Sequence, residues 1–237
     1  MEPIKPYKKS FDYSYTLGAF PTIELIKSRT NVVRGVYIHS TFTDREHLVA
    51  LCKEAKIPVL EGDKIIQRVS DKENVFVVGV FDKYECELEQ EQSHIVLVNP
   101  SNMGNLGTIL RTAVGFGIHD IAIIQPGADV FNPKVVRSSM GGLFRLRYQY
   151  FDSFEEYRNR YPKQEVFTFM LNGENPLTIN DCPKPNLFSL VFGNEATGLP
   201  DSYLKEGTSI IIPQSPEVDS LNLTIAVGIG VYMFTQR

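Results

Sequence analysis

The chain has 237 residues, 43% of them hydrophobic and 22% charged, and a formal net charge of −4. This composition is ordinary for a globular protein, and the negative charge argues against indiscriminate binding to nucleic acid. Three widely spaced cysteines and four histidines show no spacing typical of a disulfide framework or a metal site. We therefore expect a cytoplasmic protein without a bound metal. We expect no signal peptide and no membrane span either, because no apolar run is long enough.

The first eighty residues alternate between helical and extended patterns, after a basic lead over residues 1–10. Apolar periodicity predicts helices over 17–29, 43–55 and 63–69, and strands over 34–39, 57–60 and 75–81. The acidic segment DKYECELEQEQ, residues 82–92, has no apolar periodicity and is interpreted as a linker, with a solvated helix as the alternative. The sequence thus predicts a small α/β domain over 1–82, a linker over 83–92 and a second domain over 93–237.

In the second part, strand and helix patterns alternate in the manner of a mostly parallel sheet. Strands are predicted over 95–98, 120–124, 145–149, 166–171, 187–192 and 210–212, and helices over 105–115, 153–161 and 220–234. The last helix, with Ser220 as its expected N-cap, is apolar on nearly every face, so the protein or a second copy must enclose it. Its two glycines, Gly228 and Gly230, suggest close approach of another backbone.

Three loops that follow predicted strands carry unusual polar side chains, and a parallel sheet would bring such loops to one edge. The loop and helix over 99–111 hold Asn105 and Arg111; the loop GNEATG, 193–198, holds Glu195; and the loop over 213–222 ends with Ser220 and Asn222. Each residue has a simpler interpretation as a helix cap or a surface arginine. No Walker loop, dinucleotide fingerprint or serine hydrolase motif is present.

Three segments taken together resemble the three motifs of the SpoU family of RNA methyltransferases: NPSNMGNLGTILRTAVGFGI, LVFGNEATGLP and IIIPQSPEVDSLNLTIAVGI. RSSMGGLF, residues 137–144, also resembles a family segment. The resemblance implies a SPOUT fold, in which the C-terminal segment forms a deep trefoil knot. It also implies a homodimer and the cofactor S-adenosylmethionine. The N-terminal domain resembles substrate-recognition domains that are similar to certain ribosomal proteins. Pro216 and Ala196 depart from residues common in the family, Gly in both cases.

Carried over from the family motifs, the catalytic residues are Asn105, Arg111, Glu195, Ser220 and Asn222. Cofactor binding through backbone groups maps onto Leu171, Gly193, Ile212 and Leu221. The implied reaction is methyl transfer to a ribose 2′-hydroxyl, most readily of ribosomal RNA. A transfer-RNA methyltransferase, a drug-resistance enzyme acting on ribosomal RNA, and a non-catalytic RNA-binding or ribosome-assembly module remain alternatives. We expect Arg111 to grip RNA phosphate and stabilise the developing alkoxide, because a guanidinium is always protonated and therefore a poor base. The candidates for a local RNA-binding patch are Lys5, Lys8, Lys9, Arg137, Arg145 and Arg147.

Overall fold

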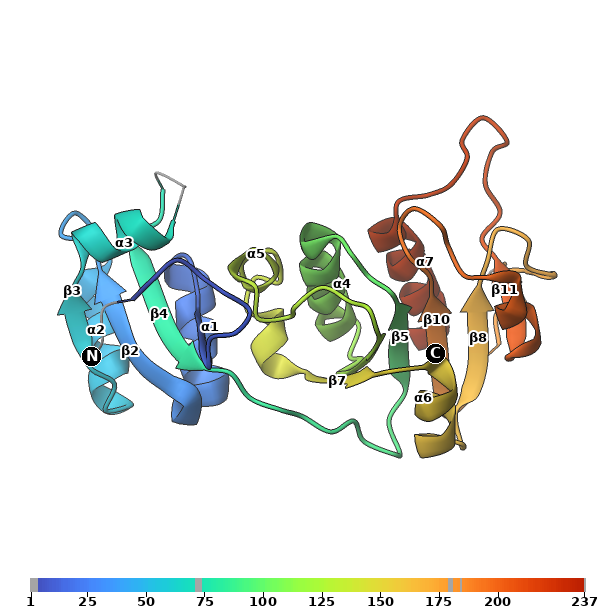
Figure 1. Ribbon diagram of the computed structural model, residues 1–237, viewed down its shortest axis with the longest axis horizontal. Coiled ribbons are helices and arrows are strands. Elements are labelled where there is room, and N and C mark those ends of the chain that lie inside the picture. Colours follow the sequence, from blue (N-terminus) through green and yellow to red (C-terminus); the bar gives the residue numbers. More distant parts are fainter. Residues whose placement is uncertain (1–3, 71–73, 179–180, 184, 237) are drawn as a thin grey trace. The chain divides into compact units, whose positions relative to one another are not determined.

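The structure is a computed structural model that describes residues 4–70, 74–178, 181–183 and 185–236, and it divides into two units (Figure 1). The first unit comprises Met1–Tyr84 and Asp129–Arg145, and the second comprises Glu85–Ala128 and Leu146–Arg237. In sequence, residues 129–145 lie between two strands of the second unit. Among the described residues, no helix combines the length and the apolar character needed to cross a membrane.

The first unit is built on a four-stranded sheet in the order β1-β4-β2-β3. Strands β1 and β2 run antiparallel to β4, and β3 runs parallel to β2. The strands are β1 (Tyr13–Tyr15), β2 (Val33–Ile38), β3 (Val59–Glu61) and β4 (Val77–Asp82). The helices are α1 (Ala19–Arg29), α2 (Arg45–Glu54), α3 (Asp63–Val69) and α5 (Pro133–Ser138), with a short 3₁₀ turn η1 (Thr30–Val32). The sequence prediction had missed β1 and α5.

Alternation along β2 sends its side chains to two separate hydrophobic clusters. Val36 and Ile38 are buried with Leu48 of α2 on one side of the sheet. Tyr37, between them in sequence, is buried with Ile66 of α3 on the other side. The first sheet is therefore covered by helices on both faces.

Residues 129–145 complete the core of the first unit. The rings of Phe131 and Phe144 pack on that of Phe81 in β4, with centroids 6.0 and 5.3 Å away. Phe81 is fully buried, and both partners are at least nine-tenths buried. The Arg145 guanidinium also donates to the Glu24 carboxylate of α1, with an Nε–Oε2 distance of 2.7 Å. This segment is thus part of the hydrophobic core of the first unit.

The second unit contains a seven-stranded sheet in the order β7-β6-β5-β10-β8-β11-β9. Every neighbouring pair is parallel, as the sequence predicted. The strands are β5 (His94–Val98), β6 (Asp120–Ile124), β7 (Arg147–Phe151), β8 (Glu165–Phe169), β9 (Asn175–Pro176), β10 (Phe188–Phe192) and β11 (Thr208–Ile211). The helices are α4 (Met103–Gly115), α6 (Phe154–Arg160) and α7 (Leu223–Thr235), with 3₁₀ turns η2 (Gly142–Arg145, in the first unit) and η3 (Asp201–Lys205).

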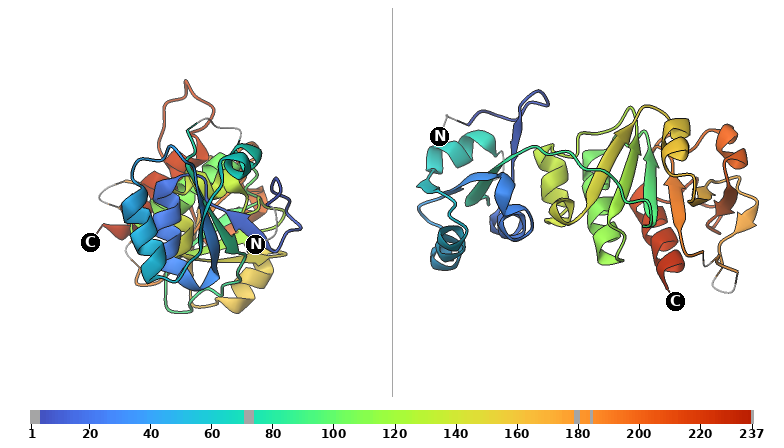
Figure 2. Two further views of the ribbon diagram at one scale, coloured as in Figure 1. Left: turned by 90° about the vertical axis from the view of Figure 1, so that its left-hand side faces the viewer. Right: turned by 90° about the horizontal axis from the view of Figure 1, so that it is seen from below.

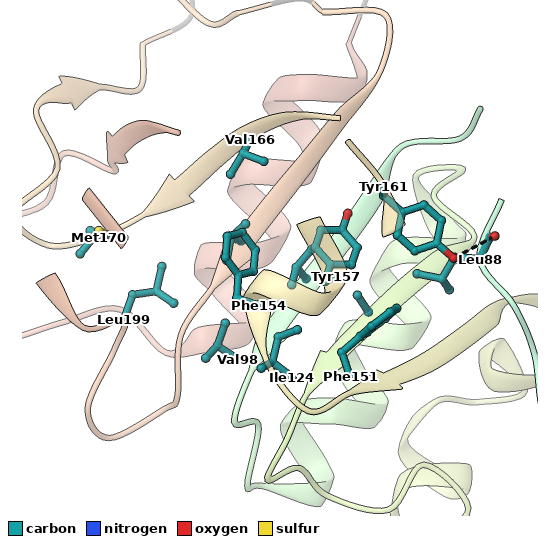
Figure 3. Close-up of a cluster of buried hydrophobic side chains, with 13 residues drawn as sticks. Leu88, Val98, Ile124, Phe151, Phe154, Tyr157, Tyr161, Val166, Met170 and Leu199 are labelled. Carbon is teal, nitrogen blue, oxygen red and sulfur yellow. Dashed lines mark hydrogen bonds between the residues drawn. The ribbon is translucent and has the colours of Figure 1, made fainter. Parts of the chain in front are cut away.

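Helices α4 and α7 pack side by side on one face of this sheet, and α6 covers the other face (Figure 2). On the α6 side an aromatic cluster fills the core, with Phe151, Tyr157 and Tyr161 all at most 1% exposed (Figure 3). The Tyr161 hydroxyl donates to the Leu88 carbonyl across 3.2 Å. Leu88 is itself buried in this cluster, so residues 85–92 of the predicted linker belong to the second unit. The segment forms no helix, and the alternative of a solvated helix is wrong.

A buried polar network lies at the amino end of the same sheet. His94, fully buried in β5, has its Nδ1 atom 2.9 Å from the Tyr157 hydroxyl and its Nε2 atom 2.9 Å from the Glu89 carbonyl. Burial lowers the pKa of His94, so the neutral imidazole is the stable form. Tyr157 in turn hydrogen-bonds with Ser189 of β10. This network ties α6, two strands and segment 83–92 together.

Helix α7 begins at Leu223, two residues later than a helix capped by Ser220 would begin. Its N-cap is Asn222, whose Oδ1 accepts from the Thr224 amide at 2.9 Å and the Thr224 hydroxyl at 2.7 Å. The prediction of Ser220 as the cap is therefore wrong. An Asn carbonyl satisfies the free amides of the first turn as well as a Ser hydroxyl does.

The face of α7 that contacts the sheet is only part of its apolar surface. Val227 and Val231 are buried, whereas Ile225 and Tyr232 are 53% and 50% exposed. A Cβ on Gly230 would lie 2.8 Å from the Phe169 ring and 3.0 Å from the Phe192 ring. The reason for Gly230 is therefore side-chain packing within the chain, and the expectation of backbone approach is wrong there. A Cβ on Gly228 would meet nothing within 4 Å among the described residues.

Candidate cofactor and catalytic site

A cavity of about 460 Å³ lies at the carboxyl ends of β8, β10 and β11 in the second unit. Its walls are the loops that follow these strands, residues 169–172, 192–199 and 210–214, together with residues 220–226 at the start of α7. This volume is in the range of small-molecule sites, which in open α/β sheets lie at this edge. Two of the three loops singled out in the sequence thus meet here, joined by the loop after β8.

The lining of this cavity favours a ligand that is neutral or positively charged. Glu195 and Asp201 contribute carboxylates, and no Lys or Arg is among the lining residues that the structure describes. A polyphosphate would find no cationic partner in it. The backbone amides of Leu171, Ile212 and Leu221 donate no hydrogen bond within the described chain. They are available to a ligand with acceptor groups.

Glu195 connects this cavity to the first motif. Its Oε2 accepts from the Ser101 amide at 3.1 Å and the Ser101 hydroxyl at 3.0 Å, and its Oε1 accepts from the Asn102 amide at 3.0 Å. Partial burial opposes ionisation. The hydrogen bonds from its own backbone amide and from the Ser101 and Asn102 amides outweigh it and lower the pKa of Glu195. The side chain is therefore an ionised clamp between the loops after β5 and β10.

The loop that carries Glu195 depends on Gly193 and Asn194. A Cβ on Gly193 would collide with the backbone of Gly198 and Leu199, so only glycine fits. The Asn194 Oδ1 accepts from the Ala196 amide at 2.9 Å, and its Nδ2 donates to the Asn99 carbonyl at 2.7 Å. Sequence reasoning missed Asn194, although an Asn that follows Gly in a turn is a common signal for such side-chain to backbone bonds.

The structure brings some of the candidate site residues together and separates others. Those that line the cavity are Leu171, Gly193, Glu195, Ile212, Ser220 and Leu221. Asn222 lies next to the lining as the cap of α7. Asn105 and Arg111 lie on α4 and do not line it. The N-cap of α4 is Asn102, which accepts from the Gly104 and Asn105 amides. The Arg111 side chain is exposed and makes no hydrogen bond or ion pair with the described residues.

A model of the SpoU rRNA Methylase family matches residues 92–232. This chain belongs to the SpoU family. An uncharacterized tRNA/rRNA methyltransferase of Synechocystis is 35% identical over 141 residues, which are 58% of this chain and 51% of the relative. This SpoU-family chain thus spans about half the length of that relative. A putative tRNA (cytidine(34)-2′-O)-methyltransferase of Listeria monocytogenes is 30% identical over 144 residues, 59% of this chain and 85% of that protein.

The fold is also that of solved SpoU-type structures. The AdoMet-bound rRNA methyltransferase of Sinorhizobium meliloti superposes with a TM-score of 0.77 at 25% identity. The match covers 94% of this chain and 86% of that one, so it includes both units. The predicted α/β fold with a parallel sheet is confirmed.

Two of the arginines proposed as RNA contacts in this SpoU-family chain are engaged elsewhere. The Arg147 guanidinium donates to both carboxylate oxygens of fully buried Asp120, at 2.8 and 2.6 Å, and pairs with Glu89. Arg145 pairs with Glu24, whose side chain is 15% exposed. Both guanidiniums are therefore paired within the chain, because a buried carboxylate requires its partner, and their contact with RNA stays a prediction. The cations of the set that are exposed and form no ion pair with the described residues are Lys5, Lys8, Lys9 and Arg137, all in the first unit.

Proposed function

We propose that this chain is an S-adenosylmethionine-dependent RNA methyltransferase that acts on a ribose 2′-hydroxyl, most readily of ribosomal RNA. Membership in the SpoU family is the observation that carries the proposal. The cavity beside Glu195 supports it, since it has the volume of a small-molecule site and its described lining holds no cationic side chain that would oppose a sulfonium.

When bound, S-adenosylmethionine supplies an electrophilic methyl group. In our proposal Leu171, Gly193, Ile212 and Leu221 hold it through backbone groups. The amides of Leu171, Ile212 and Leu221 have no hydrogen-bond partner among the described residues. The Glu195 carboxylate fixes Ser101 and Asn102, and through them the start of α4. The fixed loops hold the reacting groups in line, which is the main requirement for this transfer.

Homodimerisation belongs to the proposal because the site within one chain lacks Arg111. Helix α7 exposes Ile225, Tyr232 and the open face at Gly228, and the half-exposed Phe116 lies beside Tyr232 with ring centroids 5.9 Å apart. A second copy that covers this face would bring the neighbouring α4 helices together with their exposed Arg111 side chains. We propose that Arg111 acts on RNA at the partner's cavity, with Asn105, Ser220 and Asn222 as further polar groups of the composite site.

The first unit is the proposed RNA-recognition part, with exposed Lys5, Lys8, Lys9 and Arg137. Its presence favours ribosomal RNA over transfer RNA. Among solved structures, the rRNA methyltransferase of Sinorhizobium meliloti matches 94% of this chain, whereas a structure described by the 2-OH methylation of C/U34 on tRNA matches 61%. The tRNA reaction remains the second candidate, and the relation to the tRNA relative is what favours it. We also propose the trefoil knot, on family membership alone. We propose a cytoplasmic location because Cys52, Cys86 and Cys182 form no disulfide with one another.

The decisive experiment is methyl transfer from radiolabelled S-adenosylmethionine to RNA extracted from cells that lack this gene. Ribosomal and transfer RNA are separated before counting, and the position is mapped by resistance of 2′-O-methylated linkages to alkaline cleavage. Label in ribosomal RNA supports the main proposal, and label in transfer RNA supports the second. A protein that binds S-adenosylhomocysteine in calorimetry but labels no RNA would overturn the enzymatic proposal in favour of an RNA-binding module.

The composite site has its own test, a mixture of two inactive variants. Arg111→Ala leaves the cavity intact, and Gly193→Ala disrupts it. If Arg111 acts in the partner's site, mixed dimers contain one complete site. After unfolding and refolding together at equal amounts, the mixture should then recover roughly a quarter of the wild-type rate, because half of the dimers are mixed. Two variants that remain inactive in the mixture would show that Arg111 acts within its own chain.

A further inference from the structure

A second cavity, of about 790 Å³, lies beside the first at the same edge of the second unit. It is bordered by residues 98–101 after β5, 126–128 after β6, Ser153 and Phe154 after β7, and residues of the Glu195 loop and η3. Asn194, Thr197 and Gly198 line both cavities. A single loop of the chain therefore separates the two.

The second cavity has planar apolar walls and no charged side chain. Phe154 and Tyr203 pack on each other at an angle of 46° with ring centroids 5.0 Å apart, and Pro100, Pro126 and Pro200 add flat ring surfaces. No Lys, Arg, Asp, Glu or His is among the lining residues that the structure describes. A phosphate or a charged peptide would find no counterion here, whereas the face of an aromatic heterocycle packs on such rings.

Three polar side chains in this lining have no partner in the described chain. The Asn99 amide, the Thr197 hydroxyl and the Tyr203 hydroxyl make no hydrogen bond with the described residues. Burial raises the pKa of Tyr203 to about 12, so its hydroxyl remains a donor at neutral pH. Asn99 adopts a left-handed backbone with φ 53°, which is uncommon outside glycine and occurs more often at functional sites. An amide that offers both a donor and an acceptor can match the edge of a nucleobase.

The position of Glu195 links the two cavities. Its carboxylate lies on the first cavity and binds Ser101, which lines the second. A nucleotide with its base in the second cavity would place its ribose at the dividing loop, next to the first cavity.

We propose that the second cavity binds an unstacked nucleobase of the substrate RNA, with one face of the base on the Tyr203 ring, against which Phe154 packs, and with Asn99 at its edge. This inference rests on the proposed function for the identity of the substrate. It makes the chain selective for single-stranded or bulged RNA, because a base held in a helix cannot enter.

Two substitutions test this subsite without touching the clamp at Glu195. Asn99→Gly removes the amide and keeps the left-handed backbone, which glycine adopts freely. Tyr203→Ala removes one ring wall. The matched control is Leu204→Ala, because Leu204 is the neighbouring residue of η3, packs on the same core cluster and does not line the cavity. Calorimetry with S-adenosylhomocysteine and the thermal unfolding midpoint show whether each variant keeps the fold and the first cavity.

We expect Asn99→Gly and Tyr203→Ala to lower kcat/KM for methylation of the RNA from gene-lacking cells by about tenfold or more, as loss of a base contact does. Affinity for S-adenosylhomocysteine should stay within about twofold of wild type, and Leu204→Ala should methylate like wild type. Wild-type rates for both subsite variants would overturn the inference. So would equal losses in the Leu204→Ala control.

A binding measurement separates failure of the subsite from failure of the proposed function. Single-stranded RNA containing 4-thiouridine is irradiated with the full-length protein, and the crosslinked peptides are identified by mass spectrometry. Crosslinks at Phe154 or in residues 197–203, lost in Tyr203→Ala, support the subsite even if the wild-type protein transfers no methyl group. Crosslinks confined to the first unit, or equal crosslinking of duplex RNA, would overturn it.

Discussion

The packing of Gly230 predicts a specific cost for the smallest possible substitution on α7. A Cβ at this position would lie 2.8 Å from the Phe169 ring and 3.0 Å from the Phe192 ring. These rings are stacked on each other with centroids 4.4 Å apart, so neither can move without the other. Added methylenes in such a core cost about 1–3 kcal/mol. Alanine gains about 0.5–1 kcal/mol of helix propensity in return. Gly230→Ala should therefore lower the free energy of unfolding by about 1–2 kcal/mol.

The chain contains no Trp, so unfolding is best followed by circular dichroism. For a protein of this size the expected loss lowers the thermal midpoint by about 3–6 °C. Phe169 and Phe192 also line the first cavity, so affinity for S-adenosylhomocysteine should fall as well.

Gly228→Ala is the matched control, because its Cβ meets nothing within 4 Å among the described residues. It should stabilise the helix within one chain. If the partner's backbone approaches there, it should also weaken the dimer, and sedimentation at several protein concentrations measures this change. If Gly230→Ala raised the midpoint as much as Gly228→Ala does, the reasoning from ring packing would be refuted.

Three further predictions follow from buried groups. Because burial lowers the pKa of His94 below its unfolded value of about 6.5, its contribution to stability is present above that pH. It is lost below, at up to about 1.4 kcal/mol per pH unit. Urea unfolding at pH 7.5 and 5.5 should show this loss in wild type and in the control His47→Gln but not in His94→Gln. An equal change in the free energy of unfolding between the two pH values in all three proteins would contradict the prediction. Gly193→Ala should abolish binding of S-adenosylhomocysteine because its Cβ collides with the Gly198 backbone, whereas Gly115→Ala, which meets nothing within 4 Å among the described residues, should bind normally in calorimetry. A chain that begins at Glu91 should aggregate, since it exposes Phe131 and Phe144, and a monodisperse profile in size-exclusion chromatography would show that 129–145 does not need the first unit.

Local sequence was sufficient for elements with strong signals at both ends. Helix α3, Asp63–Val69, and strand β6, Asp120–Ile124, lie at the residues predicted for them. All five residues of β6 are buried, and the last four, Ile121 to Ile124, form the apolar run that marks the strand. Strand β1, with the sequence YSY, and the two-residue β9 carry too little pattern to be found.

The site residues divide in the same way. The motifs placed Leu171, Gly193, Glu195, Ile212, Ser220 and Leu221 at one cavity. They did not reveal which of Ser220 and Asn222 caps α7. Both residue types are good N-caps, and the choice depends on where the backbone turns into the helix. The motifs also did not reveal that Asn194 joins two loops, since its partner Asn99 lies 95 positions away.

What the sequence determined by itself is the alternation of strands and helices and the three loops at the strand ends, since both depend on residues close together in the chain. Only the tertiary structure decided where charges and segments find partners. Arg147 and Arg145 look like free cations in sequence, yet distant Asp120 and Glu24 neutralise them. Residues 129–145 follow β6 in sequence but pack in the first unit. The physical reason is that Phe131 and Phe144 are buried against Phe81, which removes their apolar surface from water.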